Sequence, residues 1–239
     1  MLVEAALICK LQYNGRDIAT LEPDVDARIE DLVDLIRNKY SGDVMDLAEI
    51  MRYFTLDVLS TVAFGRPFGF MAANSDLWDY GKTNAAFMPI FALQANHGWL
   101  RRVFASPFMQ SVAAPKVTDT MGIGPALAFA RKAVAERYGP DAKPRKDMLG
   151  HFVTKGLTQT QCEAEANLQI IAGSDSTTGA LRCTLFLLIA NPVAYGKLRS
   201  ELEGSGREGK PSSILTYREA QTLPYLSACI FEGLRMYPP

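Results

Sequence analysis

The sequence predicts a mainly α-helical protein, an array of helices of unequal length. Three observations point to this class. Apolar residues recur with the helical period of about 3.6 through several long segments. Two capping patterns, a Thr followed three residues later by Gln or Glu, occur at residues 158–161 and 216–219. No segment alternates apolar and polar residues convincingly, as a half-buried strand does, and the lack of heptads favours a globular array over a coiled coil.

We expect helices over residues 21–40, 46–62, 76–93, 121–138, 158–190, 192–203 and 224–236. In the first, Val25, Ile29 and Ile36 fall on one stripe with acidic residues between them. The Ser-Gly-Asp run at 41–43 breaks this helix, and glycines at 65 and 69 follow the second one. The segment over 76–93 has a weaker period, and Gly-Pro at 124–125 opens the next helix.

Two stretches between these helices are expected to be irregular. Residues 97–117 are rich in aromatic side chains, among them Trp99, Phe104 and Phe108. We favour a loop packed on the core for this stretch, and the alternative is an apolar lid over a ligand cavity. Residues 139–146 (GPDAKPRK) are expected to form an exposed linker.

Composition excludes several classes of function. Net charge is −1 and no basic cluster is visible, so no nucleic-acid partner is expected. The four cysteines are scattered and the two histidines lack ligand spacing, which indicates free thiols, surface histidines and no metal site. The apolar start of the chain spans fewer than ten residues and lacks the basic beginning of a signal peptide. We therefore expect no transmembrane segment in this chain.

The segment from Thr158 to Asn191 reads as one long helix with an unusual centre. Thr158 and Gln161 form a capping box, and Asn191 followed by Pro192 can end it and open the next helix. The centre, GSDSTTG over residues 173–179, consists of poor helix formers. Each glycine there costs about 1 kcal/mol relative to alanine. A costly polar patch inside an apolar helix usually has a local reason.

That patch combines small residues with an acid and hydroxyls. Ala172 and Gly173 leave a notch against which a flat ligand could lie. Asp175, Ser176 and Thr177 beside it are an acid and two alcohols, a set that can relay protons. The alternative is a small-residue helix crossing whose hydroxyls bond to the helix backbone. From this patch alone the two interpretations stand equal, although a phosphate loop and a nucleophile elbow are excluded by spacing.

Glu232 and Arg235 form the second feature. Residues three apart share a helix face, so the two can form an ion pair. A solvated surface pair is the ordinary interpretation of this common pattern. Its setting adds information, because LPYL precedes the pair and MYPP follows it.

The two features, in this order, resemble the cytochrome P-450 superfamily of haem-thiolate monooxygenases, particularly its fungal microsomal members. AGSDST is similar to the family's oxygen-binding motif, [AG]-G-x-[DE]-[TS], and LPYLSACIFEGLRMYPP is similar to its E-x-x-R helix. The stretches NPVAYGKLRSELE, TYREAQTLPYL, TLDVLSTVAFGRPFGF and YNGRDIATLEPDVD also look like the family. The resemblance covers most of the chain and is loose between residues 77 and 138.

The resemblance implies a function and a role for each residue. The protein would insert one oxygen atom into an organic substrate, using haem and electrons from NADPH through a reductase. Ala172 and Gly173 would lie over the haem, while Asp175 and Ser176, with Thr177 beside them, would support proton delivery during oxygen activation. Most relatives have Thr in place of Ser176. Glu232 and Arg235 would be a structural pair, and residues 77–117 would form the access region for a small lipophilic substrate, which revives the lid interpretation.

The chain also departs from the family pattern. The haem-ligand motif F-x-x-G-x-x-x-C-x-G, the W-x-x-x-R helix and the N-terminal anchor are not found in it. We therefore expect residues 1–239 to be an incomplete P-450-like domain: helices and the access region over 1–138, the long helix over 157–191 and the E-x-x-R part over 192–239. The iron-ligand cysteine is absent, so we predict no monooxygenase activity from these residues alone.

Two alternatives stand beside the enzyme. One is a non-catalytic, lipophile-binding remnant of the family, and the other, an unrelated helical interaction module, is disfavoured by the paired motifs. Full-length relatives are expected at the endoplasmic reticulum membrane. The substrate does not follow from the sequence, because the residues expected to select it lie in the loosely matching part.

Overall fold

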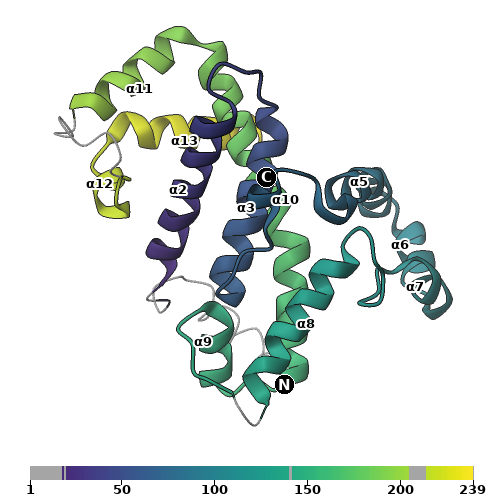
Figure 1. Cartoon of the computed structure of the whole chain (residues 1–239). Helices are drawn as coiled ribbons and strands as arrows, with labels where there is room; N and C mark the ends of the chain where they lie inside the picture. The colour runs from purple at the N-terminus through teal and green to yellow at the C-terminus, as the bar shows by residue number, and fades with distance from the viewer. Residues whose placement is uncertain (1–17, 19, 140–141, 205–213, 239) are drawn as a thin grey trace.

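The computed structural model describes residues 18, 20–139, 142–204 and 214–238, and within these ranges it contains helices and turns but no strand. The mainly α prediction is confirmed. The helices, labelled as in Figure 1, are α2 (Leu21–Lys39), α3 (Leu47–Phe64), α4 (Phe70–Ala73), the 3-10 helix η1 (Leu77–Asp79), α5 (Tyr80–Asn96), α6 (Gly98–Phe104), α7 (Pro107–Ala113), α8 (Gly124–Tyr138), α9 (Met148–Thr154), α10 (Gln159–Ala190), α11 (Pro192–Gly204), α12 (Tyr217–Gln221) and α13 (Pro224–Met236).

The pair α3 and α10 forms the centre of the molecule, with α8 and α13 also packed on α10 and with α2 on α3 (Figure 1). One apolar core joins α3, α8 and α10: Leu56 and Phe64 of α3, Ala130 of α8 and Ile170 of α10 are all almost fully buried. Helices α3 and α10 approach closely because Gly173 has no side chain. A β-carbon there would lie 3.2 Å from a methyl group of Leu59.

The ends of the central helices follow from their capping residues. Thr158 and Gln161 form the predicted capping box at the start of α10. The Asn191 side chain accepts from the Ala194 amide (3.2 Å), as expected for the residue that opens α11. At the start of α3, the Asp46 carboxylate accepts from the amides of Ala48 (2.9 Å) and Glu49 (3.2 Å).

A buried carboxylate of α3 fixes the turn that follows this helix. Asp57 is 1% exposed and accepts from the amides of Gly69 (2.8 Å), Phe70 (3.1 Å) and Met71 (2.9 Å). These N–H groups lie at the start of α4, where no helical partner is available to them. The carboxylate therefore supplies hydrogen bonds that the buried backbone would otherwise lack.

Most of the segment expected to be an irregular loop is helical and lies away from the core, although Val117 at its end packs against the core. It forms α6 and α7, and Trp99 and Phe108 are 66% and 76% exposed. Figure 1 shows α5, α6 and α7 extending to one side of α3 and α10. The favoured interpretation of residues 97–117 as a packed loop was wrong. These residues form two short helices, although their apolar periodicity is too weak to be recognised in the sequence. Helix α9 was also not predicted; it contains His151, which was expected in a loop or at the surface but is half-buried in this helix.

The other boundaries agree to within a few residues, and residues 142–146 of the expected linker are exposed and non-helical. Parts of that linker and of the 204–206 loop, and the start of the chain, lie outside the described residues. Among the described helices, none by itself has the length and apolar composition to cross a membrane; α10 and α11 meet these criteria only as a pair, across a bend of 106°.

Candidate active site

The unusual centre of α10 is an unbroken helix whose hydroxyl groups bond to its own backbone. Ser176 Oγ donates to the carbonyl of Ala172 and Thr177 Oγ1 donates to that of Gly173, each at 3.0 Å. Ser174 bonds back one turn in the same way (3.2 Å). These bonds satisfy the hydroxyls locally, which explains how poor helix formers are accommodated here.

One face of this centre is a helix crossing. Ser174 and Thr178 are buried, and Thr178 Oγ1 lies 2.6 Å from Oγ1 of Thr55 on α3. Ser174 Oγ lies 3.2 Å from the hydroxyl of Tyr80, the first residue of α5. Gly173 faces α3 at the close approach described above. The crossing interpretation is therefore correct for this face.

The opposite face is open. Ala172, Ser176 and Thr177 are exposed. Two large apolar neighbours, Leu168 and Ile171, are 54% and 50% exposed. Exposure of such apolar surface to water is unfavourable in free energy. Leu168, Ala172 and Ser176 are four residues apart and so share this face. The predicted notch is thus divided: Ala172 lies on the open face and Gly173 belongs to the crossing.

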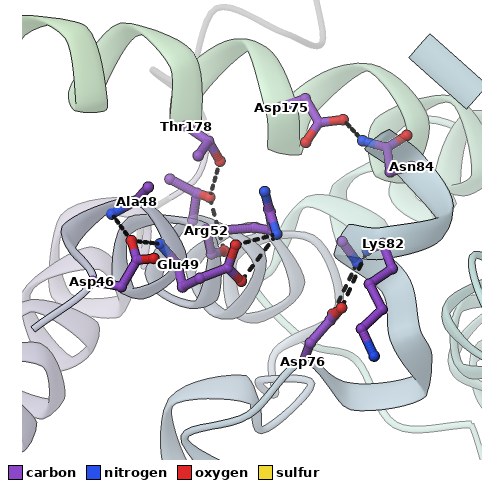
Figure 2. Close-up of polar contacts among 11 residues, drawn as sticks. Asp46, Ala48, Glu49, Arg52, Asp76, Lys82, Asn84, Asp175 and Thr178 are labelled. Atoms are coloured by element: carbon purple, nitrogen blue, oxygen red, sulfur yellow. Dashed lines mark hydrogen bonds and ion pairs between the residues drawn. The ribbon is translucent and has the colours of Figure 1, made fainter. Parts of the chain in front are cut away.

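Asp175 lies between the two faces and is half-buried. Its Oδ2 accepts a hydrogen bond from the side-chain amide of Asn84 on α5, as Figure 2 shows. Asn84 is buried, and no hydrogen bond from the described residues reaches the other carboxylate oxygen of Asp175. Burial raises the pKa of the neighbouring Tyr80 to about 12, and the charge of Asp175 acts in the same direction.

Glu232 and Arg235 form the expected ion pair, but at the surface. Two bonds of 2.7 and 2.6 Å join the guanidinium to the carboxylate, and the side chains are 58% and 65% exposed. The hydrogen bond from Arg235 lowers the pKa of Glu232. The ordinary interpretation, a solvated surface pair, is therefore what the described residues show.

A groove of about 370 Å³ lies beside this pair, and sequence analysis did not anticipate it. It runs between the second half of α10, the start of α11 and α13. Its lining includes the apolar side chains of Leu187, Leu188, Cys229 and Met236, together with Glu232. It is separate from the open face around Ala172 and Ser176.

The open face fits one side of a flat apolar group, because a single methyl at Ala172 leaves room and exposed Leu168 and Ile171 flank it. The described cysteines do not add a ligand beside it. Cys162 is buried, with Sγ 3.1 Å from the Tyr138 hydroxyl. Cys183 is eleven residues, about 16 Å, farther along α10 than Ala172, and Cys229 lies on α13. In the part of the chain that the structure describes, no cluster of His, Cys, Asp and Glu could hold a metal ion.

Comparison with known proteins decides the family. The family model "Cytochrome P450" (written P-450 below) matches residues 6–239, almost the whole chain. The chain belongs to the cytochrome P-450 family. The family resemblance carried by AGSDST and E-x-x-R is thereby confirmed.

The related P-450 proteins include three fungal monooxygenases. The chain is 40% identical to cytochrome P-450 monooxygenase ABA1 of Pyricularia oryzae over 236 residues. It is 38% identical to aba1 of Botryotinia fuckeliana over 234 residues, and each match covers 95% of this chain and 46% of the relative. A third, abl1 of Leptosphaeria maculans, is 30% identical. The chain thus spans about half the length of these curated relatives.

Solved P-450 structures have the same fold. The crystal structure of the P-450DA haem domain superposes with a TM-score of 0.66 at 19% identity, covering 90% of this chain and 45% of that one. A mutant of the same domain gives a TM-score of 0.69, with 93% and 47% covered. At this identity the likeness extends to the fold, which agrees with the predicted P-450-like helical array.

Sequence reasoning missed the residues that hold the centre of α10 from outside. These are Thr55 on α3 and Tyr80 and Asn84 on α5. Tyr80 and Asn84 are four residues apart and so face the same way. This spacing of four was the available signal, although Lys82 and Thr83 between them are polar as well.

Proposed function

We propose that this chain is the oxygen-activating part of a cytochrome P-450 monooxygenase, which inserts one atom of dioxygen into an organic substrate. Membership of the family and the activity named for its fungal relatives support this activity. The observation that carries the proposal is the open face of α10. There a small residue, Ala172, and a hydroxyl, Ser176, lie side by side among exposed apolar residues.

Ala172, Leu168 and Ile171 are the residues that would hold a haem against this face. The methyl group of Ala172 lets a flat ring approach the helix, and the two larger side chains exclude water from its edge. When bound with a thiolate ligand, haem supplies the iron at which dioxygen is activated. Among the described residues, none of the cysteines lies beside this face, so we assign the ligand to a part of the protein beyond them.

Asp175 and Ser176 supply the proton path. A hydroxyl is both donor and acceptor, so Ser176 can pass a proton on while it exchanges its bond to the Ala172 carbonyl. Asp175 is half-buried, and no hydrogen bond from the described residues reaches its second carboxylate oxygen, so it can collect protons from the solvent side. Thr177 is exposed and bonded to the backbone, and it provides a second hydroxyl at the same level.

The exposed apolar side chains of α5 to α7 favour a small lipophilic substrate. Met88, Phe91, Trp99 and Phe108 are all at least 45% exposed. Apolar surface of this kind marks a binding region, and these helices correspond to the predicted access region. Electrons would come from NADPH through a reductase partner.

Oxygen-18 labelling tests this function in a protein that contains the chain and the haem-ligand segment. With a reductase, NADPH and a lipophilic substrate, we expect one labelled atom in the product and the other in water. Ser176→Ala should raise hydrogen peroxide release about tenfold or more. Ser200→Ala is the matched control, because Ser200 also bonds to the carbonyl four residues back (2.9 Å) but lies on α11. Product without label, or equal effects of both variants, would contradict the proposal.

A further inference from the structure

The first turn of α5 is tied to the centre of α10 by two polar side chains. The hydroxyl of Tyr80 contacts Ser174 at 3.2 Å, and the amide of Asn84 donates to Asp175. Tyr80 and Asn84 are 1% and 9% exposed; the contact between Tyr80 and Ser174 is buried, and the contact between Asn84 and Asp175 is partly buried. Figure 2 shows Asn84 pointing from α5 directly at the Asp175 carboxylate.

The same turn is also fixed from its own side. The two carboxylate oxygens of Asp76 accept from the amides of Gly81 (2.8 Å) and Lys82 (3.2 Å), as Figure 2 shows. The position of Asn84 is thus set by a cap as well as by its contact with α10. Because a carboxylate can only accept here, the amide nitrogen of Asn84, not its oxygen, must face Asp175.

The rest of α5 has a different environment. Pro89 interrupts the backbone bonding of this helix one turn beyond Asn84. Past this point Phe91 and Leu93 are 50% and 51% exposed. The helix is therefore held at its beginning and leads, through α6 and α7, into exposed apolar surface.

We propose that Asn84 is a positioning residue for Asp175, and that it makes the orientation of this carboxylate depend on where the first turn of α5 lies. The Asn84 amide engages Oδ2 and leaves the other carboxylate oxygen able to take a proton. The catalytic part of this inference rests on the proposed function, whereas the link between the two helices does not.

An exchange of the two side chains tests the link in the 239-residue chain. Asn84→Asp sets two carboxylates against each other, whereas Asn84→Asp with Asp175→Asn restores a donor and an acceptor in reversed order. Hydrogen–deuterium exchange of the amides over residues 81–85 should rise about tenfold in the single variant and return to within about twofold of the parent in the double one. Asn96→Asp is the control, because the exposed Asn96 bonds to Ala92 within α5. An unchanged single variant, or a double variant that stays unprotected, would overturn the link.

A second readout separates positioning from a purely structural role. In a haem-loaded protein that contains the chain, the double variant keeps the contact but moves the acid to α5. We expect it to release more hydrogen peroxide per NADPH oxidised than the parent, with little change in KM. Parent-like release by the double variant would show that the place of the acid is immaterial, and would overturn the positioning role. A parent that inserts no oxygen would refute the proposed function and leave the exchange result standing.

Discussion

Gly233 of α13 and Thr184 of α10 lie so close that a β-carbon on Gly233 would stand 2.1 Å from the Thr184 hydroxyl oxygen. No side chain larger than hydrogen fits at this crossing. The glycine inside E-x-x-R therefore has a packing role: it sets how closely the helix that carries Glu232 and Arg235 approaches the long central helix.

Gly233→Ala should therefore destabilise the chain by about 1–3 kcal/mol, because the added methyl group overpacks the crossing. The change in the free energy of unfolding can be measured by urea denaturation. Gly196→Ala is the matched control: Gly196 is also helical, and nothing lies within 4 Å of its added β-carbon. That control should stabilise the chain by up to about 1 kcal/mol. A Gly233 variant as stable as the control would contradict the crossing.

Asp57→Ala should be among the most destabilising single changes. It leaves the buried backbone N–H groups of Phe70 and Met71 and the partly buried N–H of Gly69 without their acceptor. We expect a loss of at least about 3 kcal/mol, since each unsatisfied buried group costs about 1–3 kcal/mol. Asp46→Ala removes an exposed cap with two amide partners and should cost only about 1 kcal/mol. The reverse order in thermal or urea denaturation would show that the α4 turn does not depend on Asp57.

Tyr80→Phe should change how stability responds to alkali. Burial raises the pKa of Tyr80 to about 12 from its ordinary 10.0. The unfolded chain loses this proton above about pH 10 while the folded chain keeps it, so stability falls as pH rises from 10 to 12. The variant should lose up to about 2 kcal/mol less across this interval. Tyr217→Phe, at an exposed side chain, is the control; parallel curves for Tyr80→Phe and parent would contradict the burial of the hydroxyl.

Glu232→Gln should leave the urea midpoint of this chain nearly unchanged, and added salt should erase any difference. The Glu232–Arg235 pair is exposed, and solvent screens it. A clear loss of stability that persists in high salt would show that the pair is buried after all. Arg199→Gln offers a comparison, since Arg199 forms an equally exposed pair with Glu203 (2.7 Å).

The local chemistry of the sequence predicted most of the fold. The capping box at Thr158, the cap at Asp46 and the left-handed Gly65 that ends α3 depend on residues a few positions apart, which a sequence displays directly. The short helices α6, α7 and α9 were missed, since seven residues give too few turns to establish a period.

The site was predicted only in part, because the sequence shows which residues are neighbours along the chain but not which distant residues come into contact. Ala172, Asp175 and Ser176 are neighbours in sequence, so their grouping could be read from the motif. Which of them face outward depends on α3 and α5, and these contacts join residues about 90 to 120 positions apart. Gly173 was therefore assigned to the open notch, although Leu59 covers it.

Haem titration of the chain is the most direct test of the central claim, that the open face of α10 receives the haem. Ala172→Trp fills this face, whereas Ala190→Trp places the same side chain at an exposed position at the far end of α10. Binding is measured by the absorbance of the bound haem. We predict at least a tenfold loss of haem affinity for Ala172→Trp and parent-like affinity for Ala190→Trp. Equal affinities for the two variants would contradict the assignment of this face.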